Sequence, residues 1–280
     1  MHGLKPFLAF TFALAPTLAL AACRAPQPDL STHTDRGLQH YLDCLPPGAS
    51  LTAAHRGTQR GSPHPENSID GLDAFLDADI LLAEIDVART RDGQHILFHD
   101  GMWDDGSNGR GPVAATDWPT AQTYSLRTTK GRLTDSGVPT LEQYLARARD
   151  NIFLEIDFKT SARYSDVLEI IENYDMMGSV ILIAYSPTQA RRLRALAPDA
   201  LISIPPDTTI PGPTLTFTGG TVQPIPGPFI AKLRGRDRYA PPNLALAANA
   251  RINVTDYALE APPVLGLRDP DDFLACLSAP

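Results

Sequence analysis

Short apolar runs alternate along this chain with stretches whose apolar residues recur at helical spacing. The strand-like runs cover residues 51–54, 81–87, 152–158, 180–185, 201–204 and 252–255. Between the first two, Ser68 to Ala78 places four apolar residues, Ile69, Leu72, Phe75 and Leu76, on one helical face. Repeated alternation of this kind predicts a parallel sheet whose strands are joined by helices.

Two further helices are marked by their first residues. Thr140 is followed three positions later by Gln143, the spacing of a capping box. The run Ser186-Pro187-Thr188-Gln189 repeats the device, with proline at the first helical position. In a chain of 280 residues, such units favour a single-domain α/β fold with a closed (β/α)₈ TIM-type barrel over an open doubly wound sheet, partly because no Gly-x-Gly-x-x-Gly follows a strand.

Two stretches fit the barrel pattern poorly. Gly101 to Val138 is polar and rich in glycine, and we interpret it as a flap over the active face, because long loops without structure of their own are usually functional. Pro205 to Pro242 is rich in Pro, Gly and Thr. We therefore expect the barrel to be irregular around strands 6 and 7.

The N-terminus carries a targeting signal. Lys5 precedes an uncharged apolar run that ends in Leu20-Ala21-Ala22-Cys23, which is typical of a bacterial lipobox. We expect residues 1–22 to be a lipoprotein signal peptide, Cys23 the lipidated residue, 23–34 a flexible tether and 35–280 the folded domain. The protein would then be exported and anchored to a bacterial membrane, facing the periplasm or the cell surface. The alternative is an ordinary signal peptide with Cys23 incidental.

Cysteine usage agrees with export. Removing Cys23 leaves Cys44, just before the first strand, and Cys276, four residues from the C-terminus. We expect a disulfide between them, which an exported compartment permits. The alternative is two buried free thiols.

The charge balance limits the partners. The apolar fraction of 43% is that of a globular protein, and the formal net charge is -8. Binding to a nucleic-acid backbone needs basic faces, so we expect no nucleic-acid partner. Any phosphate that the protein binds is then a small one, met by local arginine, lysine or metal.

Acidic residues recur two apart in two of the strands. Glu84 and Asp86 share one strand face, as do Glu155 and Asp157, with Lys159 following on that face. Carboxylates aimed at one region repel each other unless a cation or lysine lies among them. All-oxygen ligation favours Mg²⁺ or Ca²⁺ over zinc.

Two histidines lie near these carboxylates in the predicted barrel. His55 ends the first strand, at the rim where barrel enzymes place catalytic groups, and Arg56 beside it suits phosphate binding. Asp92-Gly93 is a hairpin signal. If these two residues form the turn, counting outward places His99 opposite Asp86, where a carboxylate neighbour favours a proton-donating role.

Together these segments resemble the glycerophosphodiester phosphodiesterase family. The matching motifs are Ala54-His-Arg-Gly, Pro65-Glu-Asn-Ser, Glu84-Ile-Asp-Val, Asp92-Gly93, Phe98-His-Asp, Val138-Pro-Thr-Leu-Glu, the acidic strand at 152–159 and Val254-Thr-Asp. The resemblance is dense up to Lys159 and thin after it. It implies a (β/α)₈ barrel that hydrolyses glycerophosphodiesters to sn-glycerol 3-phosphate and an alcohol, with a divalent cation.

The resemblance also implies roles for individual residues. His55 and His99 become the acid/base pair, Glu84 and Asp86 metal ligands, and Arg56, Glu66 and Lys159 substrate or phosphate ligands. The family's later Glu-x-Lys falls on Asp157-x-Lys159, so either Asp157 or Glu155 is the third metal ligand. The chain has no match to the family's late Trp-Thr-x-Asn-like segment.

Two other functions remain open at this point. One is a lysophospholipase D or sphingomyelinase-like activity on membrane lipids, which an apolar groove under the flap would favour. The other is a non-catalytic surface lipoprotein that uses the barrel for binding.

Overall fold

The computed structural model describes residues 36–218, 229–233 and 250–279. The expected signal peptide, Cys23 and tether lie outside the described residues, and so does much of the stretch from Pro205 to Pro242. Within the described ranges, the helices all lack the length and apolar character that crossing a membrane requires.

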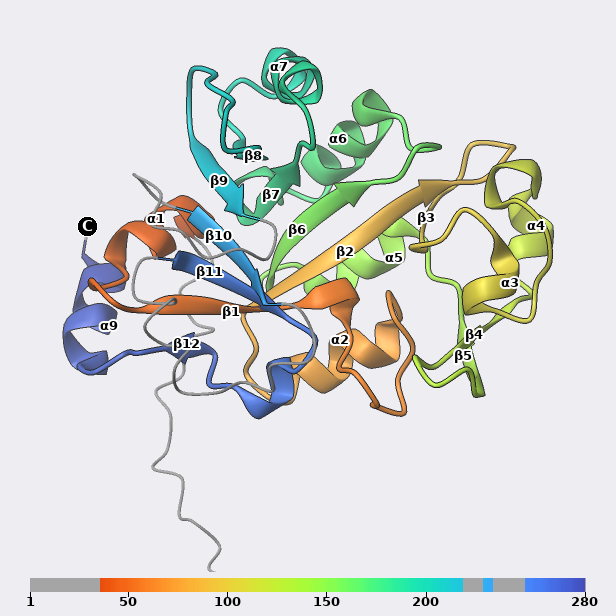
Figure 1. Ribbon diagram of the computed structural model, residues 1–280, viewed down its shortest axis with the longest axis horizontal. Helices are drawn as coiled ribbons and strands as arrows, with labels where there is room; N and C mark the ends of the chain where they lie inside the picture. The colour runs from red at the N-terminus through yellow and green to blue at the C-terminus, as the bar shows by residue number, and fades with distance from the viewer. Residues whose placement is uncertain (1–35, 219–228, 234–249, 280) are drawn as a thin grey trace, which may run out of the picture.

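The strands of the described chain form a barrel (Figure 1). Its eight parallel members are β1 (Ser50–Ala54), β2 (Leu82–Arg89), β6 (Phe153–Phe158), β7 (Val180–Ile183), β8 (Leu201–Ile204), β9 (Thr214–Thr218), β10 (Phe229–Leu233) and β11 (Ala250–Thr255). Each pairs with the next in this order, and β11 pairs back with β1. The predicted barrel is confirmed. Two short antiparallel strands extend it, β3 (His95–Leu97) beside β2 and β12 (Val264–Leu265) beside β1.

Helices cover the outer face of the first strands. They are α2 (Ile69–Leu76), α5 (Leu141–Ala148), α6 (Tyr164–Asn173) and α7 (Pro187–Leu196). Their apolar faces bury the outward residues of the barrel, such as Ile85 and Ile156. Thr140 and Gln143 form the predicted capping box at α5. At α7 the Ser186 side chain accepts the expected hydrogen bond from the backbone N–H of Gln189. The Gln189 side chain, however, accepts from the backbone N–H of Tyr185 and not from that of Ser186, so the capping box is incomplete.

The later part of the barrel departs from regular βα units, as the composition predicts. Strand β8 connects to β9 through residues 205–213, which contain no helix. Proline and glycine in this segment disfavour a helix interior. The other predicted irregular connections lie outside the described residues.

The segment from Gly101 to Val138 has structure of its own, so our expectation of an unstructured flap was wrong. It contains α3 (Trp103–Gly106), a 3₁₀ turn at Val113–Ala115, α4 (Trp118–Ala121) and the antiparallel pair β4 (Ser125–Arg127) and β5 (Leu133–Gly137). Trp103 is fully buried between Phe98 and Tyr124 at the centre of a small separate core. The segment contains few apolar residues and they do not recur at regular spacing, so hydrophobic periodicity does not predict this core. We call residues 101–138 the insertion.

The N-terminal end of the barrel is closed by apolar packing. Helices α1 (Gly37–Cys44) and α9 (Pro270–Ser278) lie against the inward side chains at the strand starts, including Leu51 and Phe153. The Tyr41 ring packs edge-on against both Phe153 and Phe273, at centroid distances of 5.4 and 5.1 Å. This end is therefore a hydrophobic plug and leaves the opposite end for chemistry.

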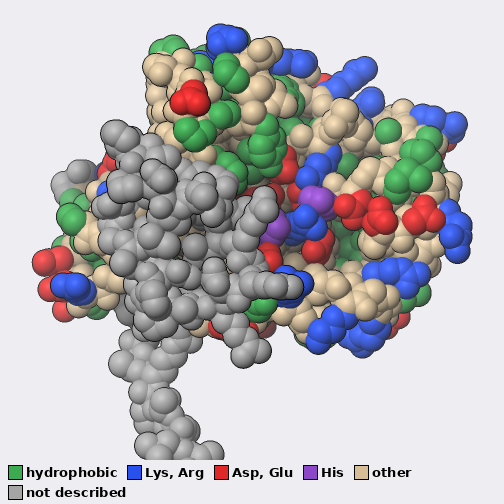
Figure 2. Space-filling view, viewed as in Figure 1, with side chains coloured by type: hydrophobic (Ala, Val, Ile, Leu, Met, Phe, Trp, Pro, Cys, Tyr) green, Lys and Arg blue, Asp and Glu red, His purple; other side chains and the backbone are tan. Residues whose placement is uncertain are grey.

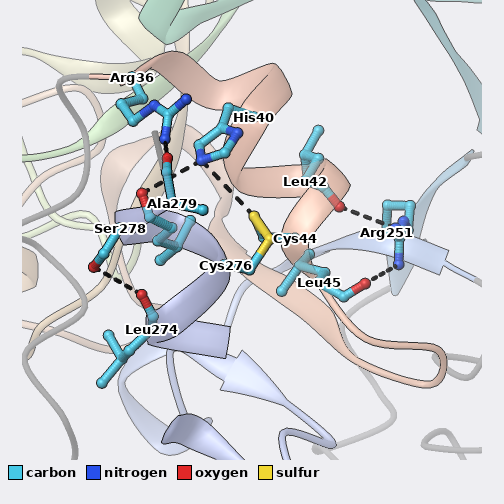
Figure 3. Close-up of a disulfide and its surroundings, with 11 residues drawn as sticks. Arg36, His40, Leu42, Cys44, Leu45, Arg251, Leu274, Cys276, Ser278 and Ala279 are labelled. Atoms are coloured by element: carbon cyan, nitrogen blue, oxygen red, sulfur yellow. Dashed lines mark hydrogen bonds between the residues drawn. A yellow bond between two sulfur atoms is a disulfide. The ribbon is translucent and has the colours of Figure 1, made fainter. Parts of the chain in front are cut away.

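A disulfide joins these two helices (Figure 3). Cys44 and Cys276 have Cα atoms 5.7 Å apart and are 232 positions apart in sequence. This is the pairing that the two cysteines left after Cys23 predict. Beside it, Arg251 donates hydrogen bonds of 3.0 and 2.9 Å to the backbone oxygens of Leu42 and Leu45. The bridge and these bonds tie both ends of the domain to the barrel floor.

Replacing both cysteines by serine (Cys44→Ser with Cys276→Ser) should destabilise the fold. Losing a bridge over so long a loop increases the conformational entropy of the unfolded chain, and we expect the free energy of unfolding to fall by about 2–5 kcal/mol. Denaturant unfolding of the double variant and the oxidised parent measures the difference. Equal midpoints, or two free thiols in the native parent, would contradict the prediction.

Candidate active site

Charged and histidine side chains gather at the C-terminal ends of the barrel strands. Figure 2 shows histidine, acidic and basic side chains together in a hollow of the surface. The loops after β1 and β3 and the strands β2 and β6 supply most of the residues that the sequence predicts.

The pairing of β2 with β6 determines the carboxylate geometry. The register sets Glu84 beside Glu155 and Asp86 beside Asp157. Glu84, Asp86 and Asp157 are buried, and each offers one oxygen atom, all within 4.8 Å of one another. Three carboxylate oxygens at this spacing suit a hard divalent cation. Glu155 is also buried but does not belong to this group of three.

Two side chains hold Asp86 in place. Lys159 Nζ lies 2.6 Å from Asp86 Oδ1 and 2.8 Å from Asp157 Oδ2. Asn67 Nδ2 donates a 2.7 Å hydrogen bond to Asp86 Oδ2, and Asn67 Oδ1 accepts one from the Asp86 backbone N–H. Burial raises the pKa of Asp86, but Lys159, His99 and these hydrogen bonds outweigh it and hold the pKa below its usual value. Asp86 is therefore ionised.

Glu84 experiences the opposite balance. Burial raises its pKa well above the usual value, and the nearby charges of Asp86 and Glu155 raise it further. The backbone N–H of Arg56 donates a 2.8 Å hydrogen bond to Glu84 Oε2, which lowers the pKa only in part. The raised pKa shows that the groups present do not fully stabilise the charge of this buried carboxylate, which a divalent cation would do. The residues present therefore fit a bound metal ion.

His55 is held by a carboxylate from the far end of the chain. Its Nδ1 lies 2.6 Å from Oδ1 of Asp256, just after β11, and its Nε2 lies 3.8 Å from Glu84 Oε2. A carboxylate on Nδ1 fixes the orientation of the ring. We did not predict this role for Asp256. The sequence signal was the motif Val254-Thr-Asp at the end of a strand.

His99 reaches the site by a different register from the one predicted. Val87 pairs with Leu97, and the backbone N–H of Phe98, not His99, faces Asp86. The hairpin turn contains three residues, 91–93, and not the two residues Asp92 and Gly93 that we expected. Gly93 adopts a positive φ of 107°, which closes this longer turn. Predicting His99 opposite Asp86 was wrong by one residue. His99 still lies close enough for its charge to act on Asp86.

The two histidines have similar supports. His99 Nδ1 lies 2.7 Å from Oδ1 of its neighbour Asp100, as His55 Nδ1 lies near Asp256. Each ring is therefore oriented through its Nδ1 atom. Both arrangements are those expected of a general acid or base.

Arg56 is placed by an unusual backbone conformation. It has a positive φ of 54°, which is rare for a residue with a side chain, and its backbone groups bond to Glu84 and to the N–H of Asn67. Its Nη1 donates a 3.0 Å hydrogen bond to Glu66 Oε2. Backbone strain of this kind tends to occur at functional sites. Here it turns Arg56 and His55 toward the carboxylates together.

Tyr185 is a further residue that the sequence reading missed. Its hydroxyl donates a 3.1 Å hydrogen bond to Asp157 Oδ2. Burial and the charge of Asp157 raise the pKa of Tyr185, so the hydroxyl stays protonated and donates. Asn67 likewise contacts a carboxylate, whereas Ser68 caps α2. Asn67 falls within the Pro65-Glu-Asn-Ser motif, and Tyr185 has no sequence signal that distinguishes it from an ordinary loop residue.

A cavity of about 500 Å³ opens between these groups and the insertion. Its described lining includes His55, Arg56, Glu66 and Asp256 from the barrel, and Asp105 and Arg127 from the insertion. Among the described residues that line it, none has an aliphatic side chain and none is Phe, Tyr or Trp. The apolar groove that a lipid substrate would need is therefore not found in the described wall.

The chain is similar in sequence to a known family of proteins. The model of the glycerophosphoryl diester phosphodiesterase family matches residues 55–204, just over half of the chain. A protein of Mycobacterium tuberculosis named probable glycerophosphodiester phosphodiesterase 2 is 27% identical over 155 residues, which cover 55% of each protein. The chain thus spans little more than half the length of the curated relatives it matches.

Solved structures share the fold. A glycerophosphoryl diester phosphodiesterase from Parabacteroides distasonis matches with a TM-score of 0.65 and 20% identity, over 79% of this chain and 88% of its own. An Oleispira antarctica phosphodiesterase, solved in complex with the product sn-glycerol-3-phosphate, matches with a TM-score of 0.55 and 15% identity, over 79% and 96%. Since the matched segment opens at His55 and runs through every carboxylate of the described cluster, the chain belongs to the glycerophosphoryl diester phosphodiesterase family.

Proposed function

We propose that the protein hydrolyses glycerophosphodiesters to sn-glycerol 3-phosphate and an alcohol. The observation that carries this proposal is the single site in which two carboxylate-supported histidines, three buried carboxylates, Arg56 and Lys159 meet. Family membership and the product-bound relative from Oleispira antarctica support it.

Glu84, Asp86 and Asp157 would hold the divalent cation. Their all-oxygen set fits Mg²⁺ or Ca²⁺, and burial together with the neighbouring carboxylates raises the pKa of Glu84, an effect that a bound cation would oppose. When bound, such an ion lowers the pKa of a nearby hydroxyl and stabilises charge on phosphoryl oxygens. Of the two candidates for the third ligand, we favour Asp157 over Glu155, because its oxygen lies with those of Glu84 and Asp86.

The remaining residues would move protons and hold the phosphate. One histidine takes the proton of the glycerol hydroxyl next to the ester, and the other gives a proton to the leaving alkoxide. Arg56 and Lys159 bind the phosphate oxygens, and Glu66 orients the Arg56 guanidinium. Water then opens the resulting cyclic phosphate, with the histidines in exchanged roles.

The two rival functions fit the site less well. A lysophospholipase D or sphingomyelinase-like activity needs apolar surface for acyl chains, and the described cavity wall consists of polar and glycine residues. A purely binding role does not account for two histidines whose Nδ1 atoms each contact a carboxylate oxygen, next to a buried acidic cluster. A small, water-soluble diester is the substrate we favour.

We also propose that the mature protein is tethered to a membrane through a lipidated Cys23. The lipobox-like ending supports this, and the disulfide agrees with an oxidising, extracytoplasmic location. Mass spectrometry of the mature N-terminus tests it, and a terminus other than lipidated Cys23 would refute it.

Replacing either histidine by alanine should remove most of the activity. We expect His55→Ala and His99→Ala each to lower kcat by about 10²–10⁴-fold, because each removes a proton-transfer group. Phosphate release from glycerophosphocholine through a coupled phosphatase measures the rate. His64→Ala, which changes a histidine whose imidazole makes no described hydrogen bond, should turn over normally. Near-normal rates for both site variants would refute the mechanism.

Removing the metal or its ligands should abolish turnover. A chelator should stop glycerophosphocholine hydrolysis, and Mg²⁺ or Ca²⁺ should restore it. Asp86→Asn and Asp157→Asn should weaken cation binding, measured by titration calorimetry, by about 100-fold or more, since each removes an ionised oxygen ligand. Asp135→Asn, on the exposed strand β5, is the matched control. Unchanged binding in both site variants would overturn the ligand assignment.

Changing Asp256 to asparagine should lower kcat while the fold and the metal site remain. The amide keeps the shape of the side chain but no longer offers His55 Nδ1 a carboxylate that fixes the tautomer and orientation of the ring, so we expect kcat to fall by about 100-fold. The pH profile of kcat and a cation titration of Asp256→Asn check this. A profile identical to that of the parent would show that Asp256 does not position His55.

A further inference from the structure

The wall of the cavity that faces the insertion contains side chains that the proposed mechanism does not use. His55 and Arg56 line one part of the cavity, and Arg127, Thr128 and Thr129 line another. The mechanism occupies the first part with glycerol and phosphate. The second part is therefore left for the alcohol that departs.

We propose that this wall selects a leaving alcohol with several hydroxyl groups, such as glycerol or inositol, over choline. The inference rests on the proposed function, because it concerns the other half of the same diester. It depends on the mixture of hydrogen-bond donors and acceptors that the insertion places there.

Arg127 is a rigid donor on this wall. Its Nε donates a 2.8 Å hydrogen bond to the backbone oxygen of Ser107, and its Nη1 donates one of 3.2 Å to that of Gly131. Within the described parts of the chain, no carboxylate lies at ion-pair distance from its guanidinium. Two carbonyls thus fix the side chain while N–H groups of Nη2 remain for a ligand.

Asp105 supplies an acceptor near Arg127. It lies in α3, two positions before the Ser107 carbonyl that receives Arg127 Nε, and it lines the same cavity. Its neighbour Asp104 pairs with Arg110, whereas in the described chain Asp105 makes no hydrogen bond or ion pair. Asp105 therefore has a full carboxylate to offer.

The tip of the insertion hairpin adds a hydroxyl. Thr129 Oγ1 accepts a 3.2 Å hydrogen bond from the backbone N–H of Gly61, which leaves the hydroxyl proton to donate. This bond also attaches the hairpin to the loop after β1. The polar wall is thus held against the catalytic loop that carries His55 and Arg56.

This set of groups matches a polyol better than the other common alcohols. Each hydroxyl of a polyol both donates and accepts, so it pairs with a carboxylate and with a guanidinium. Choline is a cation that proteins bind with aromatic faces, and the aromatic rings Trp103 and Tyr124 pack within the core of the insertion instead.

The substrate preference of the whole protein tests the inference. We would measure kcat/KM for glycerophosphoglycerol, glycerophosphoinositol and glycerophosphocholine with the same cation present. We expect the polyol diesters to be preferred by about tenfold, which corresponds to one well-formed hydrogen-bonded contact. The variants are Arg127→Met, Asp105→Asn and, as a matched control within the insertion, Arg110→Met, whose exposed side chain does not line the cavity.

Each outcome decides between specific claims. Arg127→Met should lower the ratio of polyol to choline kcat/KM by about tenfold, mainly through KM, and Asp105→Asn should raise KM for the polyol diesters, while Arg110→Met leaves both unchanged. A parent enzyme that prefers glycerophosphocholine, or an Arg127→Met variant that keeps the parent ratio, would overturn the inference and leave the proposed function standing. A parent that hydrolyses none of the three diesters would overturn the proposed function and the inference together.

Discussion

The in-register pairing of β2 with β6 is the constraint on which the site depends. It places two acidic pairs side by side, Glu84 with Glu155 and Asp86 with Asp157, at the depth of the barrel where water is scarce. Like charges at this spacing are costly in a medium of low dielectric constant. Lys159 neutralises part of the cost by contacting both aspartates, and the hydrogen bonds of Asn67 support Asp86. A cationic ligand bound among these carboxylates would lower the remaining cost.

The unfavourable free energy of these buried carboxylates at one end of the barrel is offset by favourable packing at the opposite end. The strand starts are filled by apolar side chains, covered by α1 and α9, and joined by the disulfide. The free energy gained by burying this floor offsets the unfavourable carboxylate cluster at the other end. Stability and chemistry are thus separated along the barrel axis, as is usual in this architecture.

The sequence predicts those parts of the site that follow from local periodicity. Alternation within one strand is sufficient to place Glu84 and Asp86 on the inner face, and the same holds for Asp157 on β6 and for Lys159 just after its end. Contacts between residues of different strands leave no periodic pattern in the sequence, so they cannot be predicted in this way. Asp256 reaches His55 only because β11 closes the ring beside β1, and Tyr185 reaches Asp157 only because β7 follows β6.

The errors in the sequence reading have identifiable physical causes. Asp92-Gly93 is compatible with a two-residue or a three-residue turn, and the left-handed conformation of Gly93 selects the longer one, which shifts the partner of Asp86 by one position. The insertion looked like a loop because its core depends on one tryptophan and a few neighbours rather than on repeated apolar positions. A small core of this kind is detected only when its members are seen together.

The insertion explains how one barrel chemistry can acquire its own selectivity. The residues that we propose to transfer protons and bind the phosphate lie on barrel strands and the loops that follow strands, where packing against the helices holds them in place. The residues that we propose to face the departing alcohol lie in the insertion, whose small core includes Ala88 of β2 and Ile96 of β3 and which contacts the loop after β1 through Thr129 and Gly61. Asp105 and Arg127 belong neither to the carboxylate cluster nor to the β2–β6 pairing. Changes at these two positions can therefore alter the outer wall of the cavity while the carboxylate register stays the same.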